Sequence, residues 1–205
     1  MKNNLLILLP TLLILAIIIP ACNPRDAGTL QQFSIVALTP TPSSSSILPT
    51  TAGDLRLSSP AFANNSAIPP KYTCDANSIS PELHFSNVPA GTQSLALTLE
   101  DPDAPGGVFV HWLIYNMPPT LAGLNEDVPK HANVSGVGVQ GLNSAGLAGY
   151  TGPCPTPGKI HHYIFTLYAL DLKPDLQDNL NANTLNAAMQ SHILAQVQWV
   201  GLYQK

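Results

Sequence analysis

The sequence predicts a mainly β domain, an antiparallel β-sandwich or a barrel-like arrangement, with one short helix near the C terminus. Strand signals dominate residues 54–205, where Leu95, Leu97 and Leu99 alternate with smaller residues at a period of two. Turns rich in glycine and proline separate these signals. Strands and helices do not alternate along the chain, which argues against a doubly wound parallel sheet.

Beyond the strand around Leu97, three long strands are expected at Val108–Asn116, His161–Leu170 and Val197–Tyr203, where β-branched, aromatic and leucine residues are concentrated. One helix is expected before the last strand, with Asn183 or Thr184 as its N-cap. Six residues follow helical spacing after that cap, namely Leu185, Ala188, Met189, His192, Ile193 and Gln196.

The composition excludes some classes of partner. The chain has 205 residues, of which 45% are hydrophobic and 10% charged, and its formal net charge is −4. Because it contains no basic run, it lacks the positive surface that neutralises nucleic-acid phosphates, and no nucleic-acid partner is expected. A Gly-x-Gly-x-x-Gly pattern at Gly136–Gly141 lacks the following helix and the acidic residue that dinucleotide binding needs.

The chain divides into three segments: 1–21, 22–53 and 54–205. The first has an apolar run, Leu5–Ile19, that is short for a spanning helix and typical of a secretory signal. In the second, eleven of thirteen residues between positions 39 and 51 are Ser, Thr or Pro, so we expect an extended tether. The third is long enough to form one hydrophobic core.

The first segment ends in Ile-Pro-Ala-Cys, which resembles the bacterial lipobox. The resemblance implies cleavage after Ala21 and attachment of lipid to Cys22. An uncleaved, membrane-spanning anchor is the alternative. Either arrangement would place the rest of the chain outside the cytoplasm, tethered to the membrane of a bacterial cell envelope.

Three groups of residues have side chains or backbone amides that could bind a ligand. Asp101 and Asp103 lie in a proline-stiffened Asp-Pro-Asp-Ala-Pro turn. His111 lies in a hydrophobic strand, where simple alternation places it on one face together with Phe109, Leu113 and Tyr115. A Gly152-Pro153-Cys154-Pro loop leads into a strand that begins His161-His162-Tyr163, whose first and third side chains share a face.

These motifs, in this order, resemble the phosphatidylethanolamine-binding protein family and, within it, the bacterial Raf-kinase-inhibitor-like branch. Further stretches agree with that branch: Pro69–Asp75, Ser80–Leu83, Tyr168–Asp171, Met189–Ala195 and Gly201–Tyr203. The resemblance covers 54–205 and implies a two-sheet β-sandwich with a small pocket for phosphate or a phosphorylated head group. The implied ligand-binding residues are Asp101, Asp103, His111, Gly152, Pro153, His161 and Tyr163. His162 replaces an arginine, and Phe109 a tryptophan, that many relatives have.

The resemblance leads to a hypothesis for how the pocket binds an anion. Asp101 and Asp103 would orient His111 and His161 and raise their pKa values. The imidazoles, the Tyr163 hydroxyl and the amides of the 152–154 loop would then donate to the anion. Affinity would therefore rise as pH falls.

The sequence favours other activities less than anion binding. No enzymatic activity, cofactor or metal is expected, although two histidines and an aspartate are also chemically able to hold a metal ion. A serine hydrolase is not favoured, because Ser144 lies outside a Gly-x-Ser-x-Gly elbow. The main alternative function is inhibition of an extracytoplasmic protease or other enzyme through protein–protein contacts.

Two cysteines remain once Cys22 carries lipid, and both would lie where disulfides persist. By the family resemblance, the loop of Cys74 passes near the end of the fold that holds Cys154. We therefore expect their Cα atoms within the ~7 Å that a disulfide can bridge. Two separate buried thiols are the alternative.

Overall fold

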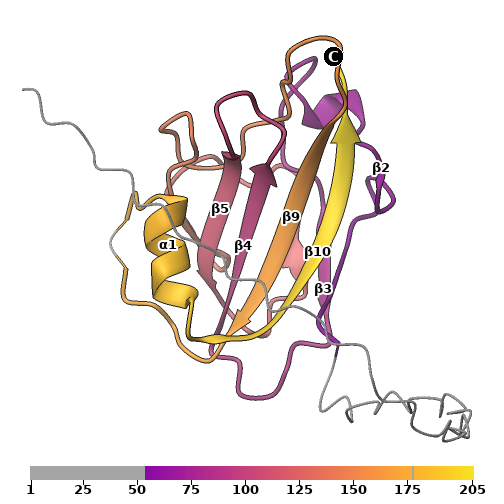
Figure 1. The fold of residues 1–205 in the computed structure, drawn as a ribbon. Helices are drawn as coiled ribbons and strands as arrows, with labels where there is room; N and C mark the ends of the chain where they lie inside the picture. Colours follow the sequence, from indigo (N-terminus) through magenta and orange to yellow (C-terminus); the bar gives the residue numbers. More distant parts are fainter. Residues whose placement is uncertain (1–53, 177) are drawn as a thin grey trace, which may run out of the picture. The chain divides into compact units, whose positions relative to one another are not determined.

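The computed structural model describes residues 54–205 except residue 177 (Figure 1). The predicted signal peptide, the predicted tether and Cys22 lie outside the described residues. No helix within the described residues is long and apolar enough to cross a membrane. In chain order the elements are β1 (Arg56–Ser58), β2 (Ser66–Ala67), the 3₁₀ helix η1 (Pro70–Tyr72), β3 (Leu83–Ser86), β4 (Ser94–Asp101), β5 (Phe109–Met117), β6 (Gly123–Leu124), β7 (Asn133–Val134), β8 (Gly138–Gln140), β9 (His161–Leu170), α1 (Ala182–Met189) and β10 (Ile193–Tyr203).

The strands form two sheets. The larger has seven strands in the order β2-β10-β9-β4-β5-β8-β7, and the smaller has three in the order β1-β3-β6. The expected mainly β domain with two sheets and one α-helix is confirmed. The expectation of purely antiparallel pairing is wrong, because β2 runs parallel to β10 where Ser66 pairs with Gly201.

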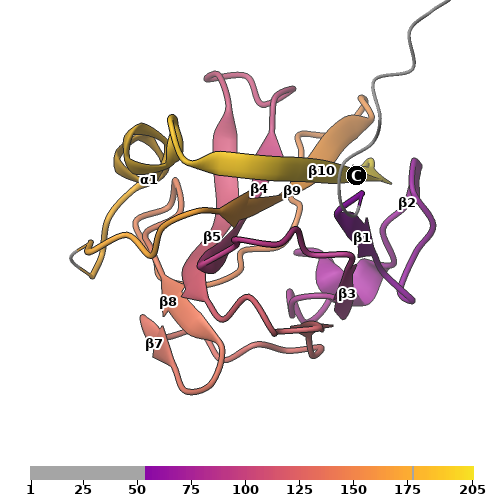
Figure 2. The same cartoon turned by 90° about the horizontal axis from the view of Figure 1, so that it is seen from below.

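Residues of β4 are buried on both faces of the larger sheet, although its sequence alternates. Leu95, Leu97 and Leu99 belong to a core cluster that also contains residues of the smaller sheet, such as Leu83. Ala96, which points to the other face, belongs to a second cluster with residues of α1. Figure 2 shows β1 and β3 side by side, away from α1. Two packed faces explain why even the small residues of β4 are excluded from water.

Helix α1 begins and ends earlier than its sequence periodicity predicts. Its N-cap is Asn181, whose side-chain oxygen accepts a hydrogen bond from the Thr184 amide, so the expected caps at Asn183 and Thr184 are wrong. The helix ends at Met189, and Ile193 already begins β10. Pairing with β9 along almost its whole length overrides the helical spacing there, since each paired residue gains ladder hydrogen bonds.

Candidate functional site

A pocket of about 200 Å³ lies at the end of the larger sheet where β4 leads into β5 and β9 begins. It brings together residues from all three groups that the sequence singled out. The lining residues are Asp101, Ala104, Pro105, Phe109, His111, Thr151, Gly152, Cys154, Pro155, Thr156 and His161. Of the predicted ligand-binding residues, Asp103, Pro153 and Tyr163 are not part of this lining.

The best-defined polar contact in the pocket joins Asp101 and His161. Asp101 is the last residue of β4 and His161 the first of β9, and these strands are neighbours. The Nδ1–H of His161 donates to Oδ2 of Asp101 at 2.8 Å, and both residues are only 3% exposed. The other carboxylate oxygen, Oδ1, accepts the Asp103 amide at 2.9 Å. The Asp101 carboxylate is therefore occupied on both oxygens, and His161 keeps its Nε2 for a ligand.

His111 owes its position to an irregularity in the strand. Leu99 pairs with Trp112 and Glu100 with Val110, so His111 is an extra residue in β5. The extra residue turns the imidazole toward Tyr163, whose ring centroid lies 5.2 Å away. The expectation that alternation groups His111 with Leu113 and Tyr115 is thus wrong, because those two residues pack in the cluster beside α1.

Hydrogen bonding and burial determine the protonation of His111. Its Nδ1 lies 2.8 Å from the Thr151 carbonyl oxygen, and because a carbonyl only accepts, Nδ1 carries the proton and Nε2 is free. Burial lowers the pKa of His111, although the Thr151 hydrogen bond and the Asp101 charge act to raise it. The expected net rise in the pKa of His111 is therefore wrong, because burial outweighs the charge of Asp101, and the lowered pKa favours the neutral imidazole at pH 7.

Asp103 acts outside the pocket. Its Oδ2 accepts both the backbone N–H and the ring Nδ1–H of His162, each at 2.8 Å. These hydrogen bonds lower the pKa of the Asp103 carboxyl. The expectation that Asp103 orients His111 or His161 is wrong. The contact instead ties the turn after β4 to the first residues of β9.

Tyr163 supports the two imidazoles from the buried side of the sheet. Its ring stacks on His161 at a centroid distance of 6.4 Å and an interplanar angle of 20°. Its hydroxyl is buried without a hydrogen-bond partner among the described residues. Burial and the charge of Asp101 raise the pKa of Tyr163, so the hydroxyl keeps its proton and remains a donor.

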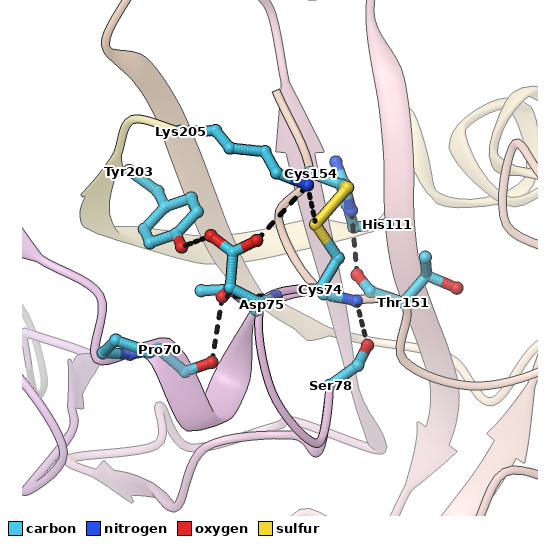
Figure 3. The surroundings of a disulfide bond; sticks show 11 residues. Pro70, Cys74, Asp75, Ser78, His111, Thr151, Cys154, Tyr203 and Lys205 are labelled. Atoms are coloured by element: carbon cyan, nitrogen blue, oxygen red, sulfur yellow. Dashed lines mark hydrogen bonds and ion pairs between the residues drawn. A yellow bond between two sulfur atoms is a disulfide. The ribbon is translucent and has the colours of Figure 1, made fainter. Parts of the chain in front are cut away.

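The 152–154 loop is held against the 73–78 loop. The Gly152 amide donates to Ser78 Oγ at 2.8 Å, and the Pro153 carbonyl accepts the Cys74 amide at 3.0 Å. The expectation that the Gly152 amide serves the anion is thus wrong, because this donor is already used. Cys74 and Cys154 form a disulfide with their Cα atoms 5.4 Å apart (Figure 3).

A sequence model described as phosphatidylethanolamine-binding protein matches residues 58–204. The chain belongs to the phosphatidylethanolamine-binding protein family. It is 43% identical over 151 residues to a UPF0098 protein of Methanothermobacter thermautotrophicus, covering 74% of this chain and 99% of that protein. It is 44% identical over 156 residues to a UPF0098 protein of Chlamydia pneumoniae, with the same two coverages.

Solved structures agree with this membership of the phosphatidylethanolamine-binding protein family. A homologue of that family from Chlamydia trachomatis superposes with a TM-score of 0.68 at 40% identity, covering 75% of this chain and 99% of the other. Escherichia coli YbcL, described as a member of the mammalian family, gives a TM-score of 0.68 at 28% identity, covering 74% of this chain and 99% of YbcL.

Sequence reasoning missed several residues of this family member's pocket. Phe109 lines it and packs on His111 with ring centroids 4.7 Å apart. Thr151 contributes a backbone carbonyl, and Ser78 holds the loop through its hydroxyl. A backbone carbonyl has no signature in the sequence, and Ser78 lies 74 positions from its partner, Gly152. Only Phe109, two residues from the strand histidine, offered a signal.

A metal centre formed by His111, His161 and an aspartate is the chemical alternative for this pocket. Over residues 54–205, position 177 aside, no three His, Cys, Asp or Glu residues gather closely enough to hold a metal ion.

Proposed function

We propose that this domain is a binding protein whose pocket takes a small anion, either phosphate or the phosphorylated head group of a lipid. The observation that carries the proposal is the pair of buried imidazoles in one pocket, each with its Nδ1 committed to a protein acceptor. Both Nε2 atoms are therefore left for a ligand, and fixed imidazoles recognise an anion without paying the entropy of ordering flexible side chains.

The protonation of the pocket is compatible with an anion that carries a proton. The negative charge of Asp101 is shared between His161 and the Asp103 amide, which reduces its repulsion of an anion. Neutral His111 accepts at Nε2, so it can bind the P–OH of a monoprotonated phosphate, and it becomes a donor when it is protonated.

Binding rather than catalysis is proposed because the lining offers no activated nucleophile. Cys154 is bonded to Cys74, and the pocket lining contains no serine that the Asp101–His161 pair could activate. The open pocket also favours a ligand over the alternative role as an inhibitor of an extracytoplasmic enzyme, because a pocket filled by a side chain would favour protein–protein contacts instead.

We further propose that the domain works outside the cytoplasm, tethered to a membrane through lipid on Cys22. The apolar segment before Cys22 and the Ser-, Thr- and Pro-rich segment after it support this location. The disulfide between Cys74 and Cys154 adds support, because disulfides persist in oxidising compartments outside the cytoplasm.

The test is a titration of the protein with inorganic phosphate and with phosphoethanolamine, followed by NMR shifts of the histidine rings at pH 5.5, 7 and 8. We expect the resonances of His111 and His161 to move, and affinity to rise as pH falls. His111→Gln should reduce the pH dependence to the part that the titration of phosphate itself contributes. His84→Gln should leave the pH dependence unchanged, since His84 lies away from the pocket and contacts Glu82. Absence of shifts in the pocket, or an affinity independent of pH, would contradict the proposal. Shifts with phosphoethanolamine alone would assign the site to head groups.

A further inference from the structure

The disulfide beside the pocket is unequally exposed. Cys154 is exposed and contributes to the pocket wall, whereas Cys74 is half-buried. A disulfide reacts with a thiolate at the sulfur that the thiolate reaches, and the other sulfur then leaves. Exposure therefore selects Cys154 as the sulfur attacked and Cys74 as the leaving group.

The leaving sulfur has a cation beside it. Nζ of Lys205 lies 3.8 Å from Sγ of Cys74 and 3.3 Å from Oδ1 of Asp75 (Figure 3). The other oxygen of Asp75 accepts the Tyr203 hydroxyl. An adjacent ammonium stabilises a thiolate, and a better-stabilised thiolate leaves faster.

Hydrogen bonds also connect the two segments that the disulfide joins. Three hydrogen bonds connect them: Cys74 amide to Pro153 carbonyl, Gly152 amide to Ser78 hydroxyl, and Tyr150 hydroxyl to Tyr72 carbonyl, at 2.7–3.0 Å. Two cysteines released by reduction would consequently remain close to each other, so the disulfide could form again without refolding the domain.

We propose that Cys74–Cys154 is a thiol–disulfide exchange site that takes a dithiol reductant, in addition to any anion in the pocket. A reductant thiolate attacks Sγ of Cys154, a new sulfur–sulfur bond forms to Cys154, and the bond between the cysteines breaks. The electron pair leaves on Sγ of Cys74, next to Lys205. The second thiolate of the reductant then attacks its own sulfur in the mixed disulfide, and Cys154 leaves as a thiolate. The reductant becomes a disulfide, and the two protein thiolates take up protons.

The first test identifies the attacked sulfur. The folded full chain is treated with 2-mercaptoethanol, free thiols are trapped with iodoacetamide after short times, and each cysteine is located by peptide mass spectrometry, which separates Cys22 from the other two. We expect mercaptoethanol on Cys154 and the alkyl group on Cys74. The reverse pattern, or reaction only in a denaturant, would overturn the proposal.

The second test measures how readily Cys74, the leaving group, ionises to a thiolate. In Cys154→Ser, the alkylation rate of Cys74 by neutral iodoacetamide is followed against pH. The apparent pKa of Cys74 should lie below the usual value of about 8.5 for a free thiol. Adding Lys205→Gln should slow reaction at pH 7 by about threefold to fivefold, as expected for losing one partly screened charge at this distance. The matched control is Lys173→Gln, since Lys173 lines a separate hollow with Asn116. Equal rates for the two lysine variants would refute the role of Lys205.

Discussion

Replacement of Gly152 by alanine tests whether the close approach of two loops builds the pocket wall. A Cβ at Gly152 would lie 2.6 Å from the Tyr72 carbonyl oxygen, 2.8 Å from Ser78 Oγ and 3.0 Å from the Thr73 carbonyl carbon. Two of these three neighbours are backbone atoms, which cannot rotate away. The loops must therefore separate, and the Gly152 amide would lose its bond to Ser78.

The expected cost has two parts. Overpacking in a well-packed site costs about 1–3 kcal/mol, and the lost hydrogen bond about 1 kcal/mol. Together they predict that Gly152→Ala lowers the free energy of unfolding by about 2–4 kcal/mol, which is a fall of roughly 5–15 °C in Tm for a domain of this size. Urea unfolding followed by tryptophan fluorescence measures the change.

Gly106→Ala is the matched control, because no atom lies within 4 Å of a Cβ at that position. The control should change stability by no more than about 1 kcal/mol, in either direction. Equal unfolding midpoints for the two variants would refute the reasoning, since the 73–78 loop would then yield without cost.

Two further predictions concern the buried pocket residues. Because burial lowers the pKa of His111, the unfolded chain binds a proton there more readily, and stability should fall as pH drops below about 6.5 and level off below the folded-state pKa. Urea midpoints against pH should show a smaller fall in His111→Gln, and an identical slope would contradict the assignment. Asp101→Asn leaves one oxygen acceptor for two donors, so we expect it to lower the free energy of unfolding, measured in urea, by about 1–3 kcal/mol. The same substitution at the more exposed Asp103 should lower it by under about 1 kcal/mol. Equal losses would be evidence against a buried Asp101–His161 contact.

Parts of the fold could be read from local pattern. The long strands were recognisable because their apolar side chains pack on the core, and packing imposes a period of two on the sequence, as at Leu95–Leu99. The helix was recognisable but its end was not. Ile193 satisfies helical spacing as well as it satisfies a strand, and only pairing with β9 decides between the two.

Site residues divide in the same way. Asp101 and His161 were recognisable as candidate site residues because carboxylate and imidazole side chains can bind ligands, whatever the fold around them. That Asp103 contacts His162 instead of a pocket imidazole depends on how the turn after β4 meets β9. The extra residue at His111 was also hidden, since a register shift belongs to a pair of strands and leaves no mark on one of them.

The sequence by itself determined the strand-rich class of the domain, its single helix and the chemical types of the pocket groups, because these depend on periodicity and on side-chain identity. Only the tertiary structure decided the pKa values of those groups and the atoms that they contact. Burial lowers the pKa of His111, the Ser78 hydroxyl accepts the Gly152 amide, and Lys205 lies beside the Cys74 sulfur. Each of these effects depends on distances between segments far apart in the chain, which no local pattern encodes.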